Sequence, residues 1–227
     1  MPNENRPRVV IWGASGHGRV VLDAILWAHD ASVVGFIDDD NSRKGESFAG
    51  YPVLGGREVL AALLADGVLR IHVAVGHCAT RQRIAVAAQT DGFSLFSVVH
   101  PRATLARDVS LGNGTFVAAG VVVNAATRLG DNVILNTSCS VDHDCVIEDG
   151  AHIAPGARLG GFVHIEEGTF IGIGAIVMNC RRIGKGSLLG AGAVAVSDIP
   201  PGVVAYGVPA RVIRDNKYSY PERGGRS

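Results

Sequence analysis

The stretch Leu129-Gly-Asp-Asn-Val-Ile-Leu135-Asn-Thr-Ser-Cys-Ser-Val141 places an aliphatic residue at every sixth position. The same period begins at Val99 and continues without an insertion to Ala195, the one member of the series that is not Val, Ile or Leu. The fifth residue of each hexad is mostly small or β-branched. An α-helix repeats about every 3.6 residues and an amphipathic strand about every two, so this period belongs to neither.

A period of six predicts a short strand followed by a tight turn, with three such units closing one triangular coil. Stacked coils place each aliphatic residue over its counterpart three hexads away, and the whole series makes between five and six coils. Each coil buries the apolar face of its neighbours, as in other solenoids. Gly often follows the aliphatic residue, as at Gly112 and Gly130, and we expect it to supply corner conformations that a Cβ disfavours. The period does not fix the handedness.

The first 98 residues follow another pattern, in which apolar strands alternate with amphipathic helices. We expect strands at 8–12, 32–37, 71–75 and 93–99, and helices at about 19–29, 57–64 and 80–88. This alternation predicts βαβ units and a parallel sheet. The predicted architecture is an α/β, Rossmann-like domain over 1–98, a parallel β-helix with a C-terminal cap over 99–214, and a flexible polar tail over 215–227.

Composition excludes several classes of function. The 227 residues carry 21 basic and 21 acidic side chains, so neither a nucleic-acid surface nor an electrostatic membrane anchor is expected. There is no apolar run of the roughly 20 residues that a transmembrane helix needs. The polar N-terminus does not resemble a signal peptide, and we expect a cytoplasmic protein. The four cysteines form no CxxC pair; Cys139 and Cys145 occupy small-residue positions and are expected in the core.

A glycine-rich turn joins the first strand to the first helix. Its spacing, Gly13-x-x-Gly16-x-Gly18, is not the GxGxxG fingerprint of dinucleotide binding. Glycines at this place let a phosphate approach the backbone and the helix N-terminus, so the turn indicates phosphate or nucleotide binding, with an unliganded tight turn as the alternative. Asp38 and Asp39 end the next strand and could bind a ribose, a base or a sugar, although an Asp run is often a solvated turn.

The most polar stretch of the repeats surrounds His143. One coil away lie Ala125 and Gly161, which leave space beside the imidazole, and Asp144 follows directly. A histidine next to an aspartate in a spacious, otherwise apolar wall suits a general base with an orienting carboxylate. The alternative is a histidine that is merely exposed on the solenoid, and His152 carries the same ambiguity.

Eight stretches in this order resemble the NeuD/PglD family of hexapeptide-repeat sugar acyltransferases. They are Trp12-Gly-Ala-Ser-Gly-His-Gly18, Phe36-Ile-Asp-Asp39, Ala74-Val-Gly76, Ile134-Leu-Asn-Thr-Ser138, Val141-Asp-His-Asp-Cys145, Ala151-His-Ile-Ala-Pro-Gly156, Gly190-Ala-Gly-Ala193 and Tyr206-Gly-Val-Pro-Ala210. The family includes sialic-acid O-acetyltransferases and N-acetyltransferases of nucleotide-linked 4-aminosugars. The resemblance implies a left-handed coil, acetyl-CoA as co-substrate, and a homotrimer with active sites between subunits.

The resemblance also implies roles for individual residues. Contacts to the nucleotide sugar would come from Ser15, Gly16, His17, Asp38, Asp39 and Gly76. His143 would be the base, Asp144 its polar partner, and the Gly161 N–H would meet the oxyanion. His152 would contact the acetyl-CoA thioester, while Ile173 and Ala191 would line the pantetheine path. No metal is implied.

The predicted reaction is N-acetylation of a nucleotide-linked 4-amino-4,6-dideoxysugar by direct attack on acetyl-CoA, in glycan or polysaccharide biosynthesis. The alternative within the family is O-acetylation of a sialic-acid-type sugar. The sequence also leaves open an acyl-carrying Cys145, a metal enzyme whose ligands are His143, His152 and His164 shared between subunits, and a non-catalytic sugar-binding scaffold.

Overall fold

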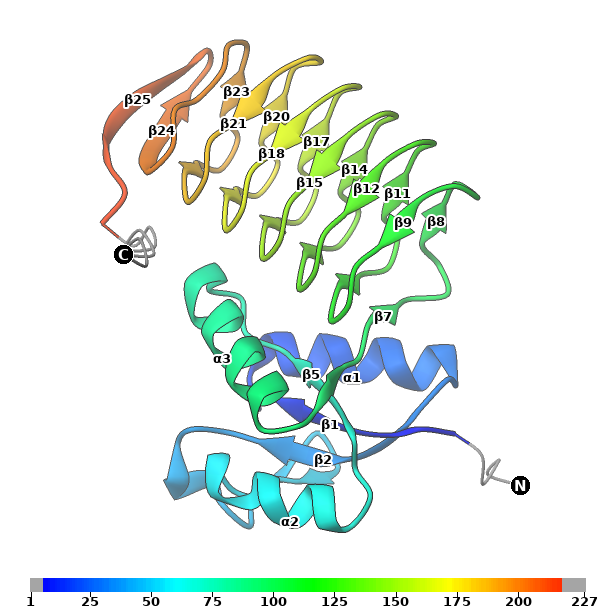
Figure 1. Ribbon diagram of the computed structural model, residues 1–227. Helices are drawn as coiled ribbons and strands as arrows, with labels where there is room; N and C mark the ends of the chain where they lie inside the picture. The colour runs from blue at the N-terminus through cyan, green and yellow to red at the C-terminus, as the bar shows by residue number, and fades with distance from the viewer. Residues whose placement is uncertain (1–5, 218–227) are drawn as a thin grey trace, which may run out of the picture.

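The computed structural model describes residues 6–217 and shows an α/β unit followed by a parallel β-helix, the predicted fold class (Figure 1). The elements of the α/β unit are β1 (Arg8–Trp12), α1 (Gly16–Ala28), β2 (Ser32–Ile37), η1 (Asn41–Arg43), β3 (Ser47–Phe48), β4 (Tyr51–Pro52), η2 (Arg57–Val59), α2 (Leu60–Ala65), β5 (Arg70–Val73), α3 (Cys78–Thr90) and β6 (Ser94–Leu95). Its sheet has the order β2-β1-β5-β6 with all pairs parallel, and β3 and β4 form a separate hairpin.

The β-helix has three faces, each a ladder of two-residue strands from successive coils. Face 1 contains β7 (Val98–Val99), β10 (Phe116–Val117), β13 (Ile134–Leu135), β16 (His152–Ile153), β19 (Phe170–Ile171), β22 (Leu188–Leu189), β24 (Val203–Gly207) and β25 (Ala210–Asp215). Face 2 contains β8 (Thr104–Leu105), β11 (Val122–Val123), β14 (Ser140–Val141), β17 (Arg158–Leu159), β20 (Ile176–Val177) and β23 (Val194–Ala195). Face 3 contains β9 (Ser110–Leu111), β12 (Arg128–Leu129), β15 (Val146–Ile147), β18 (His164–Ile165) and β21 (Arg182–Ile183). The turns between faces form three edges, named 1/2, 2/3 and 3/1 below.

The coils stack with the predicted register of three hexads. On face 1, for example, Val117 pairs with Leu135, and Leu135 pairs with Ile153. The aliphatic residue of every hexad from Val117 to Ala195 is buried, as is nearly every small or β-branched residue two positions before it. The repeat therefore forms one continuous apolar column, and its first coil is the more open end, because Leu111 is partly exposed.

The glycines that follow the aliphatic residues have a different role from the predicted one. A Cβ on Gly112 would lie 2.3 Å from the carbonyl carbon of Gly130 in the next coil, so this glycine permits close stacking of the coils. The left-handed conformation falls two residues later, where Gly114 has a φ of 69°. It recurs at every sixth residue to Gly192.

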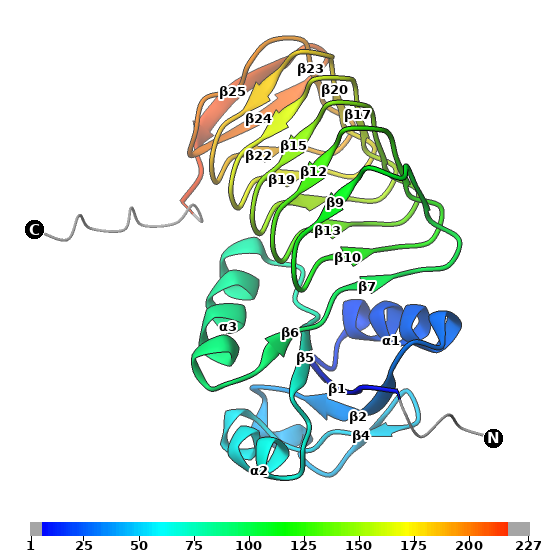
Figure 2. The ribbon, with the colours of Figure 1, turned by 45° about the vertical axis from the view of Figure 1, so that its right-hand side comes forward.

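The α/β unit packs on face 1 and edge 3/1 of the first coils (Figures 1 and 2). Buried residues of β1 and α1 belong to the same hydrophobic cluster as the interior of the β-helix. The side chain of Arg81, on α3, is fully buried and donates hydrogen bonds to carbonyl oxygens of both parts. These belong to Val75, Gly76, Asn132, Gly150 and Ala151.

Several element boundaries differ from the sequence expectations, and three of these differences bear on the fold. Helix α1 begins at Gly16, so the glycine turn forms its first turn; a Cβ on Gly18 would lie 2.0 Å from the carbonyl oxygen of Gly13. The strand expected at 93–99 is divided into β6 and β7. Strand β24 pairs in parallel with β22, and β25 runs back antiparallel to β24 as far as Asp215; of the predicted tail, residues 218–227 lie outside the described part. Between residues 6 and 217, every helix is too short or too polar to span a membrane.

Candidate active site

The residues predicted to bind a nucleotide sugar gather at one edge of the α/β sheet. Ser15 to His17 follow β1, Asp38 and Asp39 follow β2, and Gly76 follows β5, so these segments leave three adjacent parallel strands at their carboxyl ends. Asp38 Oδ2 accepts a hydrogen bond from the backbone N–H of Ala14 at 2.9 Å. Ligands of open α/β sheets bind at this edge.

The glycine turn is the candidate anion site. Ser15 is the N-cap of α1 but makes no side-chain capping hydrogen bond, which leaves the first-turn N–H groups open to an acceptor. Arg43, which sequence reasoning missed, donates to the carbonyl oxygen of Ala14 and lies 3.4 Å from Asp38 Oδ2. The guanidinium groups of Arg43 and Arg19 both lie over the Phe48 ring, so two cations flank the turn. The positions of Arg19 and Arg43 in the sequence do not predict that the two side chains meet at Phe48.

The turn also meets face 1 of the β-helix. The rings of His17 and His152 are 6.5 Å apart. His152 Nδ1 lies 3.0 Å from the carbonyl oxygen of Gly76, which can only accept, so Nδ1 carries the proton. The other nitrogen, Nε2, then accepts from the side-chain amide of Asn136 at 3.2 Å. His152, Gly76, Phe170 and neighbouring residues line a pocket of about 430 Å³ between α3 and face 1.

Three histidines at this junction are held neutral. Burial, together with the charges of the nearby His72, His152 and Arg81, lowers the pKa of His17 to about 3. Burial also lowers the pKa of His72 and of His152 to about 4, with Arg81 contributing to both. At neutral pH these three imidazole rings are therefore uncharged.

His143 lies elsewhere, on edge 2/3 in the turn between β14 and β15. Its Nδ1 is 2.8 Å from Asp144 Oδ2, and because a carboxylate only accepts, the proton is on Nδ1 and the Nε2 lone pair is open. The hydrogen bond to Asp144 raises the pKa of His143, desolvation opposes this, and the charges of Asp142 and Asp144 add to the rise. The half-exposed imidazole can therefore take up a proton at Nε2.

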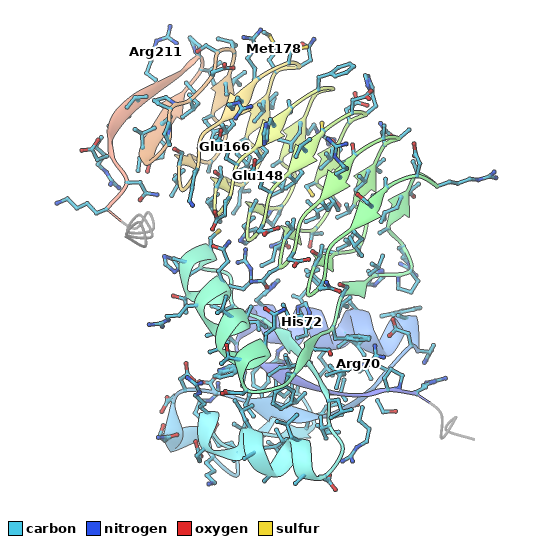
Figure 3. All side chains as sticks on the ribbon, viewed as in Figure 1. Arg70, His72, Glu148, Glu166, Met178 and Arg211 are labelled. Atoms are coloured by element: carbon cyan, nitrogen blue, oxygen red, sulfur yellow. The ribbon has the colours of Figure 1, made fainter. Side chains whose placement is uncertain are left out.

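Gly161 lies one coil further along, against the imidazole, as the sequence indicated. A Cβ at this position would be 2.8 Å from both Cε1 and Nε2 of His143, so only glycine fits. Among residues 6–217 no acceptor takes the Gly161 N–H. Both residues line a pocket of about 570 Å³ with Phe162, Ile176 and Met178. Figure 3 places Met178 at the outer margin of the coils, far from His72 at the domain junction.

Cys139 and Cys145 are fully buried in the core, as predicted. Burial raises the pKa of Cys145 to about 11 and that of Cys139 to about 12. The thiol of Cys145 donates to the carbonyl oxygen of Gly160 at 3.2 Å. A thiolate is the nucleophilic form, so this environment does not suit an acyl-carrying cysteine.

The remaining predicted residues do not meet His143 within one chain. Ile173 and Ala191 lie on edge 1/2 in successive coils, and His152 lies on face 1, opposite edge 2/3. His164 is on face 3, where Nε2 is 2.5 Å from Glu148 Oε1. In the described part of the chain, no group of three or more His, Cys, Asp or Glu side chains could hold a metal ion.

Comparison with known proteins agrees with both halves of the fold. Residues 8–88 match the PglD N-terminal domain, and residues 126–161 match the bacterial transferase hexapeptide family of six repeats. The chain is 38% identical to a mutant of perosamine N-acetyltransferase from Caulobacter crescentus, solved in complex with CoA and GDP-perosamine. The two structures superpose with a TM-score of 0.88 over 91% of this chain and 97% of that one. The chain belongs to the NeuD/PglD family of hexapeptide-repeat acetyltransferases.

Two more relatives support this membership. The acetyltransferase domain of PglB from Neisseria gonorrhoeae, solved with acetyl coenzyme A, is 37% identical, with a TM-score of 0.85 over 92% of this chain and all of that one. The GDP-perosamine N-acetyltransferase of Escherichia coli O157:H7 is 28% identical over 158 residues, which are 68% of this chain and 71% of that one. Family members of this kind are acetyl-CoA-dependent enzymes.

The neutral histidines predict a loss of stability in acid. His17, His72 and His152 have folded pKa values of about 3 to 4 against an ordinary value of 6.5, so the unfolded chain takes up their protons first as the pH falls. The free energy of unfolding should fall from about pH 6.5 to about pH 4, by about 1.4 kcal/mol per pH unit for each proton. Urea-induced unfolding at several pH values in this range measures the free energy of unfolding. His17→Asn should make the slope shallower by about one proton, and a slope equal to that of the wild type would contradict the assignment.

Proposed function

We propose that the protein is an acetyl-CoA-dependent N-acetyltransferase that acts on the 4-amino group of a nucleotide-linked 4-amino-4,6-dideoxysugar. The observation that carries the proposal is the hydrogen-bonded His143–Asp144 pair, in which Nε2 of His143 is open and lies against Gly161. The solved relative from the same family binds CoA and GDP-perosamine. By likeness to that relative, GDP-perosamine is the first substrate to consider. The reaction would serve glycan biosynthesis in the cytoplasm, where acetyl-CoA is available.

In this mechanism the neutral sugar amine attacks the thioester carbonyl directly. His143 Nε2 removes a proton from the attacking nitrogen, and Asp144 stabilises the imidazolium that forms. The N–H of Gly161 donates to the oxyanion of the tetrahedral intermediate. The C–S bond then breaks, and the imidazolium returns its proton to the departing CoA thiolate. No covalent enzyme intermediate is needed, consistent with the buried thiol of Cys145.

The nucleotide portion of the substrate would occupy the carboxyl edge of the α/β sheet. The open N–H groups of the first turn of α1, together with Arg43, would take the diphosphate, while Asp38 and Asp39 would accept hydrogen bonds from the nucleoside. The sugar would then extend toward Gly76 and the neutral wall formed by His17 and His152. We propose these roles because the same segments converge in the structure.

We propose further that the active site is completed by a second copy in a homotrimer. His143 on edge 2/3 and His152 on face 1 are on opposite sides of the same coil. A substrate held at the α/β sheet therefore reaches a base only if edge 2/3 of a neighbour approaches. In that arrangement acetyl-CoA lies between subunits, beside Ile173 and Ala191 of edge 1/2. Large exposed apolar side chains on edge 1/2 and face 2, such as Ile173 and Ile176, favour such contacts.

A thiol-release assay with acetyl-CoA tests the reaction. The acceptors are GDP-, UDP- and dTDP-linked 4-amino-4,6-dideoxysugars and free sialic acid. Turnover with one of the aminosugars, with an N-acetyl product by mass spectrometry, is the expected result. Turnover with sialic acid alone would replace the proposal by O-acetylation, and no thiol release with any acceptor would reject it.

The His143–Asp144 pair predicts a specific pH dependence. The base must be neutral, so the rate should rise with pH through the raised pKa of His143. His143→Ala should lower kcat by about 10²–10⁴-fold with small changes in KM. Asp144→Asn should lower kcat and move the acidic limb of the kcat profile to lower pH, because it removes the interaction that raises the pKa. Asp108→Asn, on the same edge but bonded to the N–H of Ala126, is the matched control; an unmoved limb in Asp144→Asn would contradict the assignment.

The proposed trimer predicts complementation between inactive variants. His143→Ala and His152→Ala chains should each be inactive, whereas trimers co-assembled from both should contain sites with two intact histidines. Each trimer that contains both variants has one intact site, which is about a third of the wild-type number. The mixed species, purified with two different tags, is assayed with the acceptor identified above. Absence of recovered activity in verified mixed trimers would place the whole site in one chain.

A further inference from the structure

One edge of the β-helix has no glycine at its positive-φ positions, whereas the other two edges have mostly glycine there. From Gly114 to Gly192 every sixth residue has a positive φ. On edges 1/2 and 3/1 these positions hold glycine with two exceptions, Asn132 and Ser138. On edge 2/3 none is glycine, and the four residues are Ala126, Asp144, Phe162 and Cys180. Because side chains disfavour this conformation, their presence along one edge indicates that they are used there.

Phe162 is the most unusual member of this column. Its φ is 59°, a conformation rarely adopted by bulky residues, and its side chain is 57% exposed. Backbone strain and exposed aromatic surface both disfavour phenylalanine, and neither is compensated by burial in the core. Such outliers gather at functional sites.

The contacts of Phe162 are with the proposed base. Its ring centroid lies 5.3 Å from that of His143, with the ring planes at 90°, an edge-to-face geometry. The backbone N–H of Phe162 donates to the carbonyl oxygen of His143 at 3.0 Å. The phenyl group also lines the pocket of about 570 Å³ into which the imidazole faces.

The imidazole needs this contact because its other restraints leave one motion free. The hydrogen bond to Asp144 fixes Nδ1 but permits the ring to pivot about that atom. Gly161 has no side chain and limits approach from one side only. With the His143 side chain half exposed, the phenyl ring is the group positioned to hold the imidazole plane.

We propose that Phe162 is a positioning residue for His143, and that it fixes the ring plane so that Nε2 faces the acceptor amine. The proposal rests on the proposed function of His143 as the base. Productive geometry of this kind is sensitive to small displacements, of which about 1 Å can cost about 100-fold in rate.

Three substitutions of Phe162 separate positioning from stability. Phe162→Gly relieves the backbone strain and should raise Tm by about 2–4 °C while lowering kcat at least about 10-fold, with KM for both substrates little changed. Phe162→Leu should also lose kcat, because it is apolar but has no ring. Phe162→Tyr should restore kcat to near the wild-type value. Ala126→Gly, in the same column but away from the pocket, should raise Tm and leave kcat unchanged.

Three outcomes would overturn the proposal. Unchanged kcat in Phe162→Gly would show that the ring does not position the base. A rise in KM for acetyl-CoA with unchanged kcat would assign Phe162 to the wall of the co-substrate groove. A smaller assembly by light scattering would assign it to a subunit contact.

A measurement without turnover keeps this inference distinct from the proposed function. If the wild-type protein turned over no acceptor, the proposed function would fail. The ¹³C–¹H signal of His143 Cε1 would still report the position of the ring. A shift or broadening of this signal in Phe162→Gly, reversed in Phe162→Tyr, supports positioning, whereas an unchanged signal rejects it.

Discussion

The structure depends on the stacking of coils in a register of three hexads. Each strand of the β-helix has only two residues up to β23, so no coil is stable alone, and the buried aliphatic column and the parallel ladders act together. The register also determines the chemistry. His143 lies over Gly161 because the two are one full coil apart, and the imidazole fits because that position has no Cβ. Deletion of one residue between them would bring Phe162 to the place of Gly161, against the proposed base.

A second constraint is the junction between the α/β unit and the β-helix. Arg81 holds backbone carbonyl groups of both parts with one buried guanidinium group. Its charge helps to keep His17, His72 and His152 neutral, and the carbonyl group of Gly76, which Arg81 also contacts, sets the tautomer of His152. Attachment of the two parts and the neutral character of the histidine wall proposed to face the sugar therefore depend on the same side chain. The hydrophobic cluster that continues across the junction reinforces the attachment.

Much of this arrangement could be predicted from the sequence, because it follows from the regular six-residue spacing of the repeat. The hexad period specified the coil, the inward residues and the contact between His143 and Gly161. The same count explains why His143 and His152 are apart, since one and a half hexads separate them and this is half of one coil. Arg81 and Arg43 could not be found in this way, because their contacts join segments that are distant in sequence and do not repeat. The sequence does show that Phe162 stands at a position where other edges have glycine. The significance of this became clear only from the backbone φ angles.

The C-terminal hairpin limits the length of the solenoid. A stack of parallel strands has an open end whose unpaired backbone groups could recruit the first coil of another molecule, as edge strands do in fibrous aggregates. On face 1 the ladder ends instead with β24 and the antiparallel β25, whose exposed residues include Arg214 and Arg211, the latter labelled in Figure 3. At the other end the α/β unit covers β7. The two ends of this face are therefore closed by different structures, a hairpin at one end and the α/β unit at the other.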